Sequence, residues 1–272
     1  MILQIETGSQ SLKEMNTFQF NKLSELHDGK HIFFTKTDFI LNDLVQISKL
    51  KNDVILISGN SDYVIGDAHL KLIPNNLKIW FATNAIVSHP KIINLPLGIE
   101  NYKPSVREGH GIGYDRVKVK DNFITNLVQR EPKEFIYANF NVNTNINHRT
   151  QVRDICINSQ HITWDEPNLS IEKFFDRILD FEAVVCAQGN GPGDNHRIYE
   201  TLYLGRIPIT FNKVMYNLLH HNFPIICLDD PLILNDYKTL KTEIENKKHK
   251  EWNKDMLNVD YWKSQILTYL DK

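Results

Sequence analysis

From Lys30 onward, short runs of β-branched and aromatic residues alternate with longer stretches in which apolar residues recur at helical spacing. This alternation is typical of βαβ units, in which helices connect the strands of a parallel sheet. The chain has 272 residues, of which 42% are hydrophobic, so a sizeable core is available. The sequence therefore predicts a globular α/β fold.

The alternation also predicts where the elements lie. In the first half we expect strands at residues 31–35, 54–57, 78–81 and 92–95. Asp38 is expected to cap a helix whose apolar positions are Ile40, Leu41, Leu44, Val45, Ile47 and Leu50. In the second half we expect strands at 134–139, 161–164, 183–187, 207–210 and 224–228, and helices at 149–158, 170–179, 235–249 and 256–270.

The two halves are predicted to be separate domains. Residues 101–121 contain Pro104 and three glycines and show no sustained periodicity, which predicts a long loop or an interdomain passage. We therefore expect two Rossmann-like domains facing a cleft, a small amino-terminal one at 1–125 and a carboxy-terminal one at 126–272.

Charge and hydropathy exclude several classes of partner. Thirty-one basic and 33 acidic residues give a net charge of −2, so no global positive field attracts nucleic acid or an anionic membrane. The longest apolar runs are far below the roughly 20 residues of a membrane helix, and the amino terminus lacks the pattern of a secretory signal. We expect a cytoplasmic protein with no nucleic-acid partner. Residues 247–250 are expected to be a solvated helix face, with at most a peripheral contact to anionic lipid or glycan.

No metal or cofactor is expected. Cys156, Cys186 and Cys227 are far apart and mostly within apolar runs, which favours reduced buried thiols. No Asp-x-Asp triplet offers a metal site. Asp229-Asp230, followed by proline, is predicted to make a turn and a helix cap, and His220-His221 to cap a helix end.

The most informative segment is 183–210, which has the order strand, glycine-rich loop, helix, glycine and strand. Such a loop and helix start lie at the carboxyl end of a parallel strand, where open α/β sheets bind ligands. Asp194 or Asn195 can cap the helix, whose first amides are able to bind phosphate. The predicted ligand-contacting residues of the loop and helix start are Gly189, Asn190, Gly191, Asp194, Asn195 and His196.

Two charged side chains complete this segment. Arg197 lies in the first helical turn and Glu200 three residues later, so both project from nearly the same face as His196. An arginine there suits a diphosphate, and a carboxylate one turn deeper suits ribose hydroxyls. A mobile turn with a solvated ion pair is the alternative, but the orderly succession to Gly205, expected as a left-handed cap, and Pro208 favours a binding site.

The segment 188–209 resembles the donor-binding segment of exostosin-like glycosyltransferases, in which a glycine-rich loop precedes an arginine, a glutamate and an Ile-Pro strand. Residues 135–149 resemble the start of the carboxy-terminal domain in that group, and residues 80–84 and 95–100 its interdomain region. The resemblance touches about half of the chain.

The resemblance implies a GT-B glycosyltransferase whose second domain binds a nucleotide sugar, UDP-linked by default, and whose first domain binds a glycan or lipid-linked acceptor. It implies a role in polysaccharide biosynthesis and an inverting reaction. The lack of an Asp-x-Asp triplet, with Arg197 at the helix start, separately predicts a donor site that works without metal. Arg197 would neutralise the leaving diphosphate and Glu200 would bind the ribose. Asn139, Thr144 and Arg149 would line the same pocket, with Arg149 equally interpretable as a helix-surface charge.

A glycosyl transfer also needs a group that accepts the proton of the attacking hydroxyl. Asp62, Asp67 and Glu100 follow strands of the first half, and we favour Asp62 because it lies soon after the apolar run 54–57. A turn-forming role for Asp62 is an equal alternative. The sequence also allows a sugar-nucleotide epimerase or hydrolase on the same fold, or a noncatalytic glycan- or nucleotide-binding module, and leaves the sugar, the acceptor and the oligomeric state open.

Overall fold

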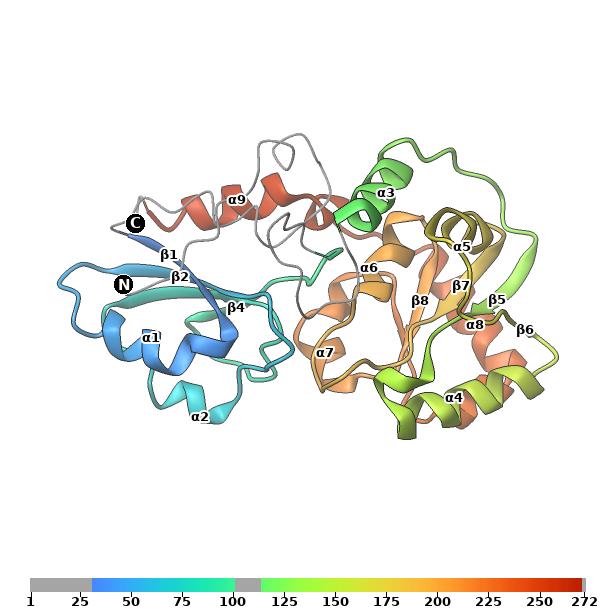
Figure 1. Cartoon of the computed structure of the whole chain (residues 1–272), viewed down its shortest axis with the longest axis horizontal. Helices are drawn as coiled ribbons and strands as arrows, with labels where there is room; N and C mark the ends of the chain where they lie inside the picture. Colours follow the sequence, from blue (N-terminus) through green and yellow to red (C-terminus); the bar gives the residue numbers. More distant parts are fainter. Residues whose placement is uncertain (1–30, 101–113, 271–272) are drawn as a thin grey trace. The chain divides into compact units, whose positions relative to one another are not determined.

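The computed structural model describes residues 31–100 and 114–270, and these residues form two compact α/β units (Figure 1). Residues up to Val117 and from Lys254 onward make the first unit, and Lys118–Asn253 makes the second. Each unit is built on one parallel sheet, of four strands in the first and five in the second. The predicted α/β class with parallel sheets is thus confirmed.

The sheet of the first unit has its strands in chain order. These are β1 (Ile32–Lys36), β2 (Val54–Gly59), β3 (Leu77–Ala82) and β4 (Ile92–Asn94). Because successive parallel strands connect with one hand, their connections lie on one face of the sheet. This face carries α1 (Ile40–Ile47), which follows the 3-10 turn η3 (Thr37–Phe39), and the short α2 (Asp67–Leu70).

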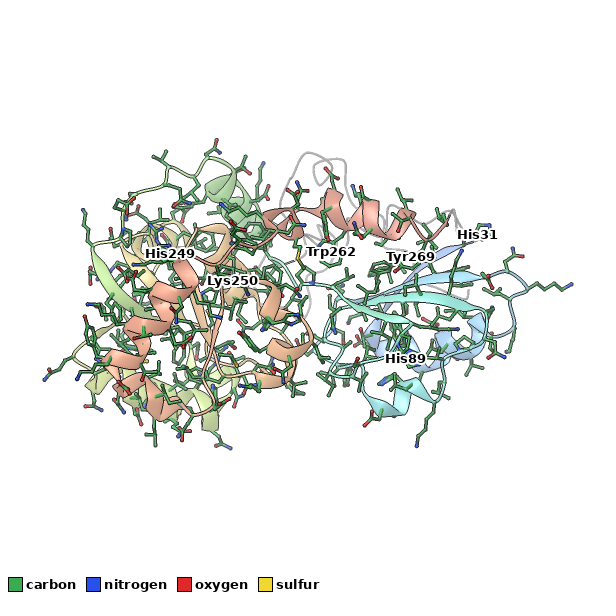
Figure 2. The ribbon with its side chains drawn as sticks, turned by 180° about the vertical axis from the view of Figure 1, so that it is seen from behind. His31, His89, His249, Lys250, Trp262 and Tyr269 are labelled. Atoms are coloured by element: carbon green, nitrogen blue, oxygen red, sulfur yellow. The ribbon has the colours of Figure 1, made fainter. Side chains whose placement is uncertain are left out.

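The opposite face of that sheet is covered by the end of the chain. Helix α9 (Val259–Leu267), which follows η7 (Lys254–Leu257), packs Trp262 and Ile266 against Ile57 and Phe81. Figure 2 shows Trp262 and Tyr269 between this segment and the sheet, and the Tyr269 ring meets the Phe81 ring edge-on at 5.8 Å. The sequence predicts one domain boundary, at 125/126. In the structure the chain enters the second unit at Lys118 and returns to the first at Lys254, because α9 completes the core of the first unit.

The sheet of the second unit has the order β6-β5-β7-β8-β9. Its strands are β5 (Glu134–Ala138), β6 (Ile162–Trp164), β7 (Phe181–Val185), β8 (Ile207–Thr210) and β9 (Ile226–Cys227). Its helices are α3 (Tyr114–Thr125, which begins in the first unit), α4 (Ile146–Asn158), α5 (Ile171–Ile178), α6 (His196–Tyr203), α7 (Lys213–Leu218) and α8 (Tyr237–Lys248), with 3-10 turns η4 (Val142–Thr144), η5 (His220–Asn222) and η6 (Pro231–Asn235).

This strand order creates a topological switch point between β5 and β7. From β5 the chain passes through α4 to β6 on one side, then returns to β7 and proceeds the other way. Helix α4 therefore packs on one face of the sheet together with α8, and α6 lies on the opposite face (Figure 1). The two helices diverge where β5 and β7 end, and ligands of open α/β sheets bind at such points.

Two local predictions are wrong for physical reasons. Residues 101–121 were expected to be a loop, but α3 begins at Tyr114; residues 101–113 lie outside the described part. From Arg116 onward, where burial is described, the buried side chains of this helix are Val117, Lys120 and Asp121; two of these three are charged, so an apolar periodicity misses them. Asp38 lies within η3 and its side chain caps no helix, since Phe39 holds the position before α1.

None of the helices in the described part of the chain reaches the length and apolarity that a membrane crossing requires.

We predict that Trp262→Ala lowers the free energy of unfolding by about 3–5 kcal/mol, because it empties a large site between α9 and the sheet. Urea denaturation followed by circular dichroism measures this. Leu267→Ala, on the same helix but 42% exposed, is the control and should cost less than about 1 kcal/mol. Equal losses in the two variants would contradict the packing described here.

Candidate functional site

The predicted glycine-rich loop lies at the switch point of the second unit. It leaves the buried end of β7 and reaches α6, whose first residue is His196. Gly205 follows α6 in the left-handed region, with φ of +70°, as the sequence predicted. The loop therefore lies at the carboxyl end of a parallel strand, next to the carboxyl end of β5.

Arg197 is held at the start of α6 by three different contacts. Its Nε lies 3.0 Å from a Glu200 oxygen, its Nη1 donates to the Asn139 carbonyl at 3.3 Å, and its guanidinium lies 3.9 Å from the centre of the Phe174 ring. Its side chain is nevertheless 27% exposed. The guanidinium is thus fixed in direction while part of the side chain remains exposed, which suits an arginine that binds an anion.

Glu200 is almost fully buried between two cations. One carboxylate oxygen pairs with Arg197 and the other with the ammonium of Lys120 on α3, and its side chain is 4% exposed. A buried carboxylate needs such partners, because removal from water costs several kcal/mol per ion. The predicted alignment of Arg197 and Glu200 is present, but the carboxylate faces protein cations rather than open solvent.

Arg149, in the first turn of α4, lies on the other side of the loop. Its guanidinium donates to the carbonyls of Gln188 (2.6 Å), Asn141 (2.7 Å) and Ala187 (3.3 Å). Burial and the charge of Arg197 lower the pKa of Arg149 to about 10. Among the described residues it has no carboxylate partner. It is neither a simple surface charge nor free to wrap around a ligand, since it already holds the loop.

Asp194 is the most enclosed group of the loop. Its carboxylate accepts hydrogen bonds from His220 Nε2 at 2.9 Å, from its neighbour's amide at 2.8 Å, and from the hydroxyl of Tyr199. Burial raises the pKa of Asp194, but His220 and these hydrogen bonds outweigh it and hold the pKa below its ordinary value. The side chain is fully buried, so Asp194 anchors the loop to α6 and η5.

Two asparagines hold three further loop carbonyls. Asn145, which caps α4 through its side-chain oxygen, donates its amide to the Gly189 carbonyl at 2.9 Å. Asn212, which caps α7, donates to the carbonyls of Pro192 and Gly193 at 2.8 and 2.7 Å. The loop is consequently held from α4 on one side and from the end of β8 on the other.

The other predicted residues of the second unit lie around the same loop. Asn139 is buried and its amide donates to the carbonyls of Asp165 and Glu166, so it fixes the turn after β6. Thr144 is exposed at the end of η4. Asn195 occupies the position before α6 but its side chain makes no capping bond. Asn190 is exposed, and Gly189, Gly191 and His196 are partly so.

The predicted base lies in the first unit. Asp62 is exposed in the connection after β2, as is Asp67 at the start of α2, and Glu100 is partly buried. Asn60, directly after β2, has a φ of +52°. Asp62 belongs to the first unit, and the predicted residues around the glycine-rich loop belong to the second.

Several groups that sequence analysis set aside have structural partners. Asp230 caps η6, as expected, and Asp229 pairs with Lys213. His221 contacts the Tyr216 carbonyl of α7 at 3.2 Å, whereas His220 does not cap a helix but pairs with Asp194.

The cysteines and the lysine run 247–250 were not expected to take part in catalysis. The three cysteines are free thiols. In the lysine run, Lys248 pairs with Glu182 and Lys250 donates to backbone carbonyls. No group of three His, Cys, Asp or Glu side chains suited to a metal ion occurs within 31–100 and 114–270.

Sequence reasoning missed Lys120, Asn145, Asn212 and His220. The two asparagines directly precede helices, so helix-cap preference signals their positions but not which carbonyls they reach. Lys120 gave no signal because its helix has a partly charged buried stripe. His220 needs knowledge of a partner 26 residues away in the chain.

Comparison with protein-family models finds no match for this sequence, and a search of curated proteins finds none either.

We predict that Lys120→Met lowers the free energy of unfolding by about 3 kcal/mol. The substitution removes one of the two cations that pair with the buried Glu200 carboxylate and leaves the pair with Arg197. Chemical denaturation measures the loss. Lys118→Met, an exposed position on the same helix, is the control and should change stability by less than about 0.5 kcal/mol. A wild-type denaturation midpoint in the Lys120 variant would show that the pair contributes nothing.

Proposed function

We propose that this protein is a glycosyltransferase that transfers a sugar from a nucleoside diphosphate, with UDP as the favoured carrier, to a glycan or lipid-linked acceptor. The second unit would bind the donor and the first unit the acceptor, with the two facing a cleft in the manner of GT-B enzymes. The reaction would be inverting and independent of metal, and the enzyme cytoplasmic. The support for this proposal comes from the second unit.

One observation carries the proposal: two guanidiniums lie at the switch point, and one of them, Arg149, has no carboxylate partner in the described part of the chain. Burial lowers the pKa of Arg149, and the charge of Arg197 lowers it further, because the two cations repel one another. Both donate to carbonyls that follow β5, those of Asn139 and Asn141. An anion placed beside them relieves this repulsion, and a diphosphate matches arginine geometry.

The helix start adds to this attraction. The first amides of α6 have no carbonyl partner within the helix, and the helix dipole favours negative charge at this end. In a glycosyl transfer the charge on the leaving diphosphate grows in the transition state, so donors fixed in advance stabilise that state more than the substrate. Arg197 is fixed in this way by Glu200 and Phe174.

Glu200 has a second part in this proposal. Since Arg197 and Lys120 already use its two oxygens, its first task is to hold the Arg197 guanidinium toward the ligand. Each carboxylate oxygen has a further lone pair, so a ribose hydroxyl remains able to donate to it if the donor reaches this depth. Asp62 is the proposed base that accepts the proton of the acceptor hydroxyl.

We predict that Arg197→Ala weakens UDP binding by roughly 30-fold, equivalent to about 2 kcal/mol, because a charge-assisted contact to phosphate is lost. Isothermal titration calorimetry with a panel of nucleoside diphosphates measures this. Arg153→Ala is the control, because Arg153 is a partly exposed helical arginine paired with the adjacent Asp154. Wild-type affinity in the Arg197 variant would remove the main support for the proposal.

We predict that Asp62→Asn lowers the rate of sugar transfer at least 100-fold and leaves UDP affinity unchanged, because a general base contributes about 10²–10⁴ to a rate. The rate is measured with a radiolabelled donor and an acceptor panel. Asp53→Asn, an exposed aspartate that precedes β2 at the other end of the same strand, is the control. Full activity in the Asp62 variant would assign the base elsewhere.

The same assay separates the alternatives. Donor consumption without acceptor indicates a hydrolase or epimerase, and UDP binding without any turnover indicates a noncatalytic binding module.

A further inference from the structure

The loop between β7 and α6 has its carbonyl groups fixed by side chains from outside it. Arg149 holds those of Ala187 and Gln188, and Asn212 holds those of Pro192 and Gly193. All the peptide bonds of the described residues are trans. In a trans peptide unit the carbonyl and the next residue's N–H point in opposite directions.

The direction of several loop amides follows from this geometry. The N–H groups of Gln188 and Gly189 point away from Arg149, and the N–H of Gly193 points away from Asn212. Contacts within the protein therefore set the directions of these peptide groups before any ligand binds.

The space beside Gly189 is open. A Cβ atom built on Gly189 meets no heavy atom within 4 Å, and its φ does not lie in the left-handed region. The glycine is therefore not required by the fold of the loop itself. A residue without a side chain at this point leaves room for a ligand to reach the backbone.

Asn212 is placed to control this arrangement. It is 5% exposed, both hydrogens of its side-chain amide go to the loop, and its oxygen accepts the Met215 amide at 3.1 Å. Its three bonds connect the loop to the start of α7, so its orientation is fixed from both sides. Asn212 is not among the residues that the sequence predicts to contact the ligand.

We propose that Asn212 is a positioning residue for the diphosphate: by holding the Pro192 and Gly193 carbonyls, it keeps the loop before α6 in the one conformation that contacts the bound phosphates. This inference rests on the proposed function for its ligand, and it names the diphosphate as the group that the loop contacts. Because the loop is ordered before binding, little conformational entropy is lost when the ligand arrives.

The test compares Asn212→Ser with the wild-type protein. Serine retains a cap for α7 but is too short to reach the loop carbonyls. Hydrogen exchange at residues 187–195 reports the order of the loop, and calorimetry with UDP and with inorganic pyrophosphate reports binding. We expect at least tenfold faster exchange and about tenfold weaker binding of both ligands. Pyrophosphate has neither base nor sugar, so a shared loss locates the effect at the phosphates.

The matched control is Asn76→Ala in the first unit. The Asn76 amide likewise donates to backbone carbonyls, those of Ile47, Leu50 and Asn52, so its loss costs comparable structure. We expect a lower denaturation midpoint in this variant, with unchanged loop exchange and ligand binding. If it weakens UDP binding as much as Asn212→Ser does, the effect is one of general stability and the inference is overturned.

A second variant tests whether the ligand approaches the loop at Gly189. Gly189→Ala should fold and exchange as the wild type does, because the added methyl group meets open space, yet bind UDP at least fivefold more weakly because that space is where the ligand approaches. Wild-type UDP affinity in both Gly189→Ala and Asn212→Ser, with the wild-type protein binding normally, overturns the inference and leaves the proposed function intact. Absence of binding by the wild-type protein overturns the proposed function and the ligand named here, while the exchange data then decide whether Asn212 orders the loop.

Discussion

The second unit depends on the satisfaction of backbone carbonyls in the segment that joins β7 to α6. Each carbonyl that is buried in this loop must find a donor, since an unpaired one costs as much as a lost hydrogen bond. Here the donors come from helix α4 and from the end of β8, which are remote in sequence from the loop. Side chains from elsewhere in the second unit therefore decide which way the peptide groups of the loop face.

Charge is distributed around this loop in an uneven way. Glu200 lies between Lys120 and Arg197, and Asp194 is engaged by His220 and Tyr199, so both carboxylates are used within the protein. The Arg149 guanidinium donates its hydrogen bonds to backbone carbonyls, which are neutral and therefore do not cancel its charge. The arrangement therefore keeps positive potential at the switch point in a protein whose net charge is −2.

Most strands and helices were predictable because each depends on the pattern of residues within its own segment. The nine strands of the described part of the chain lie within a few residues of where β-branched runs placed them, and Gly205 has the backbone conformation expected of a helix end. The strand order of the second sheet, the pairing of α9 with the first sheet and the start of α3 were not accessible. Each depends on contacts between distant segments, or on a buried stripe that includes Lys120 and Asp121.

The site was predictable in part for the same reason. The proximity of Arg197 and Glu200 follows from helical spacing, and the place of the loop follows from the strand before it. The packing of α4 and β8 decides which loop carbonyls Arg149 binds. It also decides that Asn212, and not the predicted Thr144, donates to the loop. Residue type and spacing identify a cation but do not say whether a carbonyl or a ligand receives its hydrogen bonds.

The position of α9 has a consequence for biosynthesis. The second unit is one continuous stretch, Lys118–Asn253, so all of it leaves the ribosome before the helix that the first sheet still lacks. The strands of the first sheet are therefore made early, whereas the helix that covers Ile57 and Phe81 is made last. Until α9 is synthesised, the nascent chain carries this apolar face without the helix that covers it in the native protein.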